Sequence, residues 1–243
     1  MTDFDLRAAA TARFAWNAAW DQTLTRRPEY VSAALGLDSA AERSGHLDPK
    51  TRAFVRIALN ATMTHLAPHA TRCAIRDAVA AGATHEEIVE VLFVACTISV
   101  HAMNADVLAE VLEERGERTG PAPLSEAQER IRADFAATRG YWRDFLDLTL
   151  ELAPDFLDAY LAFSGAPWEH GVLEPKVREF LYLAFDTSAT HLHMTGLRIH
   201  MHNALDHGAT PEEIVEVMTI AAGMGLQSLD LAMPILSEEF VSD

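Results

Sequence analysis

The sequence GATHEEIVEV at residues 82–91 returns as GATPEEIVEV at residues 208–217, a shift of 126 positions. The same shift brings further matches into register without a gap: Leu47, Pro49, Lys50 and Arg52 fall onto Leu173, Pro175, Lys176 and Arg178, and residues 64–66 onto residues 190–192. A fixed offset over so long a stretch indicates tandem duplication of one supersecondary unit. Residues kept in both copies are expected to hold the fold, whereas residues present in one copy are candidates for function.

Composition limits the classes of function. The chain has 243 residues, 49% of them hydrophobic, and a formal net charge of −17, which argues against nucleic acid and anionic membrane surfaces as partners. The segment Met1–Asp5 lacks the basic start of a secretory signal, and no apolar run of about 20 residues suggests a membrane span. The two cysteines form no disulfide framework. We expect a soluble, cytoplasmic protein.

Local signals predict helices almost throughout. Proline follows Asp48 and Glu174, where it would occupy the first helical position. Both copies of the repeated decapeptide contain the Thr-x-x-Glu pattern of a capping box, and the glycine at the start of each copy is suited to ending the preceding helix. No stretch shows a convincing alternation of apolar and polar residues with the period of two that is typical of a β-strand. The expected fold is all-α, a tandem duplication of one helical repeat.

The best candidate for a linker is the Gly- and Pro-containing stretch that starts at Gly116. A new helix is expected after it, because Ser125 and Gln128 again have capping-box spacing. We therefore predict a first repeat at residues 1–115, a linker at 116–124 and a second repeat at 125–243.

The combination of Leu-Asp/Glu-Pro-Lys-x-Arg with the later Gly-Ala-Thr-x-Glu-Glu-Ile-x-Glu-Val resembles the carboxymuconolactone decarboxylase and alkylhydroperoxidase D-like family. The resemblance covers about 70 residues in each half, so the chain is similar to a fused, two-copy member. It implies the family's helical fold. It leaves the reaction open, because the family includes lactone decarboxylases and peroxide-reducing dithiol proteins.

Redox members of that family carry Cys-x-x-Cys-x-x-x-His, with the histidine eight residues before the glycine of Gly-Ala-Thr. In the second copy this places His200 on the histidine and His193 and Gly196 on the cysteines, while the first copy has only alanines: Ala67, Ala70 and Ala74. Cys73 and Cys96 do not replace the pair. A thiol peroxidase is therefore disfavoured, since peroxide reduction by this route needs an attacking and a resolving thiol.

The family's active glutamate follows the arginine of Lys-x-Arg, which the resemblance places at Glu179 and, in the first copy, at Ala53. The second copy thus keeps Glu179, His193 and His200, our candidate catalytic residues, while the first shows alanine at all three places. A carboxyl group and an imidazole both exchange protons near neutrality when their surroundings are suitable, as decarboxylation or enol–keto isomerisation requires.

Three further residues are candidates for substrate binding: Arg198 for a substrate carboxylate, His191, and Gly196 as the small residue that leaves room for a ligand. A structural role is the alternative for two of these residues. Arg72 matches Arg198, which favours a structural ion pair shared by both copies, and His65 matches His191, which favours core histidines.

A metal site formed by Glu179, His193 and His200 is an alternative, because five histidines lie between His191 and His207. The spacing of seven between His193 and His200 is wide for one ion, and the resemblance does not require a metal. We predict no metal and no cofactor. Whether His65 or His101 of the first repeat contributes to a site stays open.

The function favoured by these patterns is a cofactor-free lyase or isomerase that acts on a small carboxylic acid or lactone. The alternative is a non-catalytic binding or scaffold protein on the same fold. The resemblance also implies a homo-oligomer, a trimer in first place and a dimer in second.

Overall fold

The computed structural model describes residues 3–103, 105–139, 142 and 146–240. Within these ranges the regular structure is helical throughout, which confirms the all-α prediction. Met1 and Thr2, part of the segment inspected for a signal sequence, lie outside the described residues.

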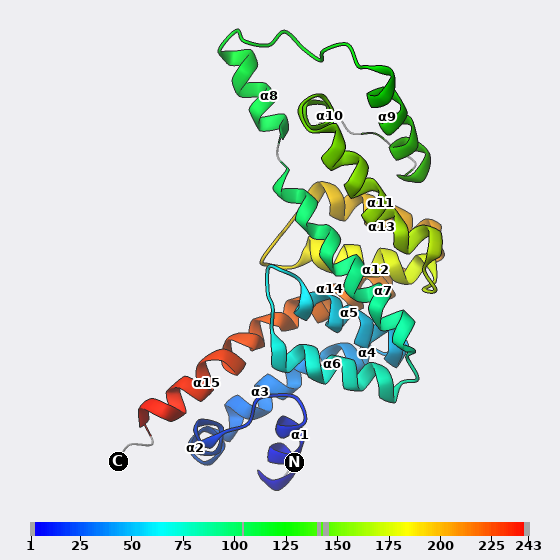
Figure 1. Ribbon diagram of the computed structural model, residues 1–243. Helices are drawn as coiled ribbons and strands as arrows, with labels where there is room; N and C mark the ends of the chain where they lie inside the picture. Colours follow the sequence, from blue (N-terminus) through cyan, green and yellow to red (C-terminus); the bar gives the residue numbers. More distant parts are fainter. Residues whose placement is uncertain (1–2, 104, 140–141, 143–145, 241–243) are drawn as a thin grey trace. The chain divides into compact units, whose positions relative to one another are not determined.

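The helices follow one another in the order of Figure 1. Their bounds are α1 (Asp3–Thr11), α2 (Ala18–Arg26), α3 (Pro28–Asp38), α4 (Ala40–Ser44), α5 (Pro49–Ala61), α6 (Pro68–Ala80), α7 (His85–Cys96), η1 (Thr97–Ala102), α8 (Ala105–Glu114), α9 (Glu126–Arg139), α10 (Asp147–Leu152), α11 (Pro154–His170), α12 (Pro175–Thr187), α13 (Met194–Asp206), α14 (Pro211–Gly223), η3 (Met224–Leu226) and α15 (Gln227–Phe240).

The helix starts have the chemistry that the sequence predicts. The Asp48 carboxylate accepts hydrogen bonds from the first N–H groups of α5. Thr84 and Glu87 exchange the two hydrogen bonds of a capping box, and Thr210 and Glu213 do the same before α14. The repeated decapeptide is therefore a helix N-terminus in both copies.

The chain forms two compact units that do not coincide with the repeats. Unit 1 contains Met1–Cys96 and Val172–Asp243, and unit 2 contains Thr97–Gly171. Unit 1 thus holds the central helices of both repeats. The predicted repeat boundaries stay a prediction.

The core of unit 1 is built around α5 and α12, which contact each other and are each followed by a hairpin partner, α6 and α13 (Figure 1). Buried side chains such as Phe54, Ile57, Phe180 and Leu183 come from these two helices. Helices α7 and α14 also contact both α5 and α12. The site described below lies on one of these hairpins.

Two buried glutamates exchange contacts between the repeats. Glu90 of α7 accepts hydrogen bonds from the N–H groups of Val172 and Leu173 and from Nε of Arg178. Glu216 of α14 makes the matching contacts with His46, Leu47 and Arg52. Burial opposes ionisation of Glu216, but hydrogen bonds from Ser44, the His46 N–H and Arg52 outweigh it and lower the pKa of Glu216. The duplication thus produces the same buried polar contact twice, with each repeat supplying the glutamate for the other.

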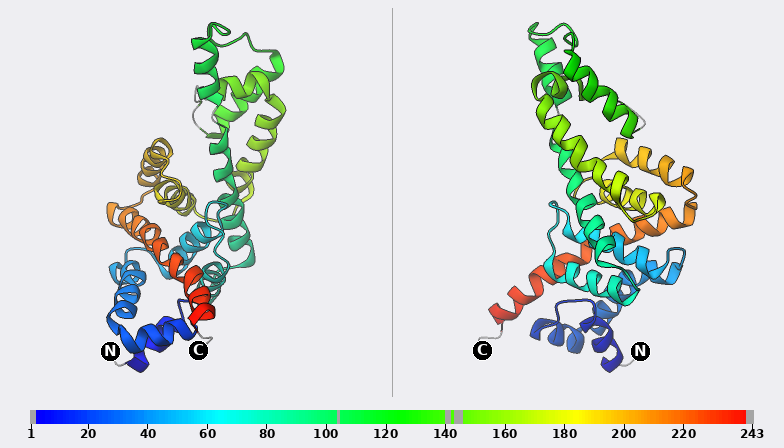
Figure 2. Two further views of the ribbon diagram at one scale, coloured as in Figure 1. Left: turned by 90° about the vertical axis from the view of Figure 1, so that its left-hand side faces the viewer. Right: turned by 45° about the vertical axis from the view of Figure 1, so that its right-hand side comes forward.

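The N-terminal helices of unit 1 have their own core, to which the last helix contributes. Helix α15 lies beside α2 (Figure 2), and Met233 of α15 belongs to a cluster with Phe14, Trp20 and Val31. Asp230 of α15 accepts a hydrogen bond from the N–H of Ala15. The C-terminal helix therefore packs against the start of the chain.

Unit 2 has a smaller core, formed by α9, α10 and α11. Its buried members include Ile131, Phe135, Leu150 and Leu157. Arg118, in the predicted linker, makes two hydrogen bonds of 2.6 Å to the Glu151 carboxylate, so this end of the linker is held by a bidentate ion pair.

Two helical stretches, His85–Glu114 and Pro211–Phe240, are long and apolar enough to cross a membrane by length and composition alone. The expectation that no segment spans a membrane stays a prediction, because core helices of proteins without a membrane span meet the same criteria of length and composition. Each stretch contains one of the buried glutamates, Glu90 or Glu216, paired with an arginine. Such pairing is typical of a protein interior rather than of a lipid-facing helix.

Candidate functional site

The second repeat brings Glu179 and His200 into direct contact. Glu179 lies in α12 and is 2% exposed, while His200 lies in the middle of the adjacent α13. The distance from Glu179 Oε2 to His200 Nδ1 is 2.7 Å, the length of a charge-assisted hydrogen bond. Two of the three predicted catalytic side chains therefore form a pair.

Two residues that the sequence analysis missed hold this pair in place. Asn203, one turn after His200, donates a hydrogen bond of 3.1 Å to the other oxygen of Glu179. The Tyr182 ring stacks on the His200 ring, with centroids 4.7 Å apart and planes inclined by 13°. The carboxylate and the imidazole are thus both oriented by neighbours.

A second buried acid, Asp186, completes the group and was also missed. It is 1% exposed, and its Oδ2 lies 4.0 Å from His200 Nε2. Burial raises the pKa of Asp186 to about 7, although His200 lowers it in part. Glu179, Tyr182 and Asp186 follow one another at spacings of three and four on α12, the spacing of one helix face, so a signal for them was present.

The histidines at the start of α13 surround Asp186. His191 Nε2 lies 3.6 Å and His193 Nδ1 3.7 Å from Asp186 Oδ1. Burial lowers the pKa of both rings, and a neighbouring histidine, His193 for His191 and His200 for His193, lowers it further. Both rings therefore bind a proton less tightly than a free imidazole does. The structure places His193 at Asp186, so its predicted role beside Glu179 stays a prediction.

Gly196 is small for a different reason from the one expected. A Cβ atom there would come within 2.1 Å of Asp186 Oδ2 and 2.5 Å of His193 Nδ1. The space that we assigned to a ligand is occupied by the Asp186 carboxylate. Glycine at this position admits the buried acid.

Arg198 does not join the group. It is exposed on α13, and residues two apart on a helix do not face each other, so Arg198 points away from His200. Arg72 is exposed as well, and neither arginine forms an ion pair within the described part of the chain. The structural ion pair proposed for both copies is therefore not found.

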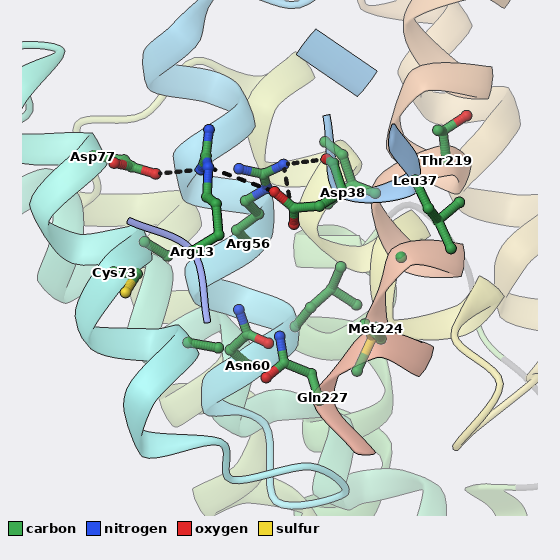
Figure 3. A pocket seen from close by; sticks show the side chains of 15 residues that line it. Arg13, Leu37, Asp38, Arg56, Asn60, Cys73, Asp77, Thr219, Met224 and Gln227 are labelled. Atoms are coloured by element: carbon green, nitrogen blue, oxygen red, sulfur yellow. Dashed lines mark hydrogen bonds and ion pairs between the residues drawn. The ribbon is translucent and has the colours of Figure 1, made fainter. Parts of the chain in front are cut away.

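The part of the first repeat that corresponds to this group lines a pocket (Figure 3), and no ionisable side chain stands at the positions of Asp186 and His200. Asn60, Ala70 and Ala74 line it, at the places of Asp186, Gly196 and His200. The first repeat thus has a hollow at this place, with neither the acid nor the imidazole of the second repeat.

Charged residues of another kind surround this first-repeat pocket. Arg13 bonds Asp77 at 3.0 Å, and Arg56 bonds Glu42 at the same distance. Cys73 also lines the pocket (Figure 3), and burial, with Asp77 as a further cause, raises the pKa of the Cys73 thiol. A raised pKa is the opposite of what a nucleophilic thiolate needs, which agrees with the disfavoured peroxidase reading.

Comparisons with known proteins agree with this organisation. The model of the carboxymuconolactone decarboxylase family matches residues 28–110 and again residues 154–235. A crystal structure from Burkholderia xenovorans LB400, described as a "putative gamma-carboxymuconolactone decarboxylase subunit", is 40% identical. The match covers 98% of this chain and 97% of that one, with a TM-score of 0.89. A search of curated proteins finds no match. The chain therefore belongs to the carboxymuconolactone decarboxylase family and carries that family's repeat twice.

Proposed function

We propose that the protein is a lyase or isomerase that needs no cofactor and transfers a proton on a small carboxylic acid or lactone. The observation that carries this proposal is the buried contact of 2.7 Å between Glu179 and His200 in the second repeat. The name of the similar structure from Burkholderia supports decarboxylation of a lactone acid as the first reaction to test.

The geometry suits a histidine that acts as the proton carrier. An ionised Glu179 accepts the Nδ1 proton of His200 and so fixes the tautomer in which Nε2 is the base. The His200 side chain is 19% exposed, so a small molecule can reach it, and Tyr182 restrains the ring plane. Glu179 then stabilises the imidazolium that forms when Nε2 takes a proton.

Decarboxylation requires the carbon–carbon bond to the carboxylate to break and CO₂ to leave. The electron pair stays on the remaining skeleton as an enolate of the lactone carbonyl. His200 takes a proton from the solvent at Nε2 and, as the imidazolium, donates it to a carbon of that skeleton. In an isomerisation the same base removes a proton from one carbon and returns it at another atom. Both reactions need only a general acid–base pair.

The test is to incubate the protein with γ-carboxymuconolactone in D₂O and to follow CO₂ release and deuterium at carbon by NMR. We expect turnover by the wild type and a loss of about 10²–10⁴-fold in Glu179→Gln and His200→Ala. His202→Ala is the matched control, because His202 is exposed on the same helix. Unchanged turnover in both variants would refute the assignment. A wild type that binds the lactone without product would favour the binding or scaffold alternative.

We also propose a homo-oligomer, with a trimer in first place and a dimer in second. Large apolar side chains of α15 are exposed in the single chain, among them Leu231 (71%) and Phe240 (71%), and such surfaces commonly mark an interface. Light scattering on the purified protein gives the mass directly, and a monomer at micromolar concentration would overturn the proposal.

A further inference from the structure

We propose that Asp186, His191 and His193 form a binding site for a divalent transition-metal ion of the zinc class. This site goes beyond the proposed function, because the proton transfer by Glu179 and His200 needs no metal. It also differs from the metal site that the sequence suggested, because the two sets of ligands share only His193.

The separations of the three side chains fit ligands of a common ion. The Asp186 oxygen lies 3.6 Å from His191 Nε2 and 3.7 Å from His193 Nδ1, and the ligand atoms are all within 4.8 Å of one another. Hydrogen bonds between such groups are shorter, about 2.7–3.2 Å. Zinc bonds of about 2.0–2.2 Å in tetrahedral geometry separate neighbouring ligand atoms by about 3.3–3.6 Å.

The burial of the Asp186 carboxylate also favours a bound cation. Asp186 is 1% exposed, and its Oδ2 has no hydrogen-bond partner among the described residues. Removing a carboxylate from water without hydrogen bonds is costly. His200 Nε2 lies 4.0 Å from Oδ2, too far for a hydrogen bond. An ion held by Asp186 and the two imidazoles would balance the charge of the carboxylate.

The backbone fixes the two histidines on either side of Asp186. Leu192, between them, has a φ of +50°, a left-handed conformation that is uncommon for a residue with a side chain. The N–H of His193 donates to the carbonyl oxygen of Asp186 at 3.0 Å, which ties the turn to α12. Glycine at position 196 leaves room for the carboxylate.

The first repeat has the same turn without the ligands. Leu66 has a φ of +47°, and the Ala67 N–H donates to the carbonyl oxygen of Asn60 at 2.8 Å. Only His65 is kept, while Asn60 and Ala67 replace the acid and the second histidine. The turn is therefore common scaffold, and the ligand set belongs to the second repeat alone.

The donor set suggests the class of ion. Two imidazole nitrogens and one carboxylate oxygen suit zinc, cobalt, nickel or iron(II) better than magnesium or calcium, which prefer oxygen alone.

The experiment measures zinc binding to the chelator-stripped full-length protein at pH 7.5, by competition with a chromophoric chelator. Cobalt(II), with its visible absorption bands, is the second probe. We expect one zinc per chain in the wild type and a loss of affinity of more than tenfold in Asp186→Asn and in His193→Ala. Each variant installs the residue of the first repeat, so both are expected to fold, which circular dichroism checks.

His65→Ala and His202→Ala are the matched controls, and we expect both to bind zinc as the wild type does. A wild type without stoichiometric zinc binding would overturn the proposal. So would Asp186→Asn and His193→Ala variants that bind zinc normally, because the ion would then sit on other histidines. Binding is read without turnover, so this result is independent of the proposed reaction.

Discussion

Arg178 and Glu179 are neighbours on α12 and both are buried, yet they bind different parts of the protein. Arg178 donates to Glu90 of the first repeat at 2.5 Å, whereas Glu179 meets His200 of its own repeat at 2.7 Å. Arg178 has a counterpart in Arg52, which contacts Glu216, but the counterpart of Glu179 is Ala53. Arg178 thus belongs to a contact that both copies make for folding. Its neighbour Glu179 belongs to a site that only the second copy has.

The first prediction concerns the contact between repeats. Glu90→Ala should lower the free energy of unfolding by about 3–5 kcal/mol, because it removes the buried carboxylate that pairs with the 5% exposed Arg178 and accepts from two N–H groups. Urea unfolding followed by circular dichroism measures this. Adding Arg178→Met to Glu90→Ala should restore part of the loss, since the buried charge is then gone.

Glu29→Ala serves as the control, because Glu29 pairs with Arg27 on the surface at 3.8 Å. A change below about 1 kcal/mol is expected there. If Glu90→Ala were as mild as Glu29→Ala, the reciprocal contact would not stabilise the fold.

The repeat explains why so much of the fold followed from the sequence. Capping boxes, proline at helix starts and glycine in the left-handed region are local chemistry, and Gly82 and Gly208 have φ values of +85° and +83° as that chemistry requires. The division into units did not follow. Which helices pack together depends on long-range contacts such as Met233 with the N-terminal helices, and local patterns carry no information about them.

The second prediction follows from the pKa of Asp186, which burial raises from 3.8 to about 7 against the effect of His200. Between about pH 4 and pH 7 the folded protein then binds a proton that the unfolded chain has lost, so stability falls as the pH rises through this window. Asp186→Asn cannot ionise. It should be more stable than the wild type above pH 7, by as much as about 4 kcal/mol, and equal to it near pH 4.

Urea unfolding in EDTA across this pH range tests the difference, with EDTA present so that no ion binds Asp186. Asp206→Asn is the control, since Asp206 is exposed on α13 and its substitution should leave the pH profile unchanged. A stability difference for Asp186→Asn that does not vary with pH would contradict the assigned titration.

The candidate site was predictable in part. Glu179 and His200 came from a family motif and from the alanines that replace them in the first copy, and the structure brings these two together. Asp186 was not predicted, because it lies outside the motifs that carry the family resemblance, and its counterpart in the first copy is Asn60. Its significance depends on burial and on the missing Cβ of Gly196, which only the packing of α12 on α13 reveals.

The third prediction concerns the helix starts that define the repeat. Thr84→Ala and Thr210→Ala should each lower the free energy of unfolding by about 1 kcal/mol, because each removes the acceptor for the N–H of the glutamate three residues later. The two effects should add, as the caps do not share a partner. Thr25→Ala, on the exposed face of α2, is a threonine control expected to change little. Equal changes in the free energy of unfolding for Thr84→Ala and Thr25→Ala would show that the cap does not stabilise the fold.

The fourth prediction concerns the ring that stacks on His200. If the stack orients the imidazole for proton transfer, Tyr182→Leu should lower kcat about tenfold or more with a smaller change in KM, because the base is misplaced rather than removed. Tyr182→Phe keeps the stacked ring and should retain most of kcat, so any remaining loss reports the hydroxyl group. Steady-state kinetics on all three proteins separates these effects. Equal losses of kcat in the two variants would assign the role of Tyr182 to its hydroxyl and not to the stack.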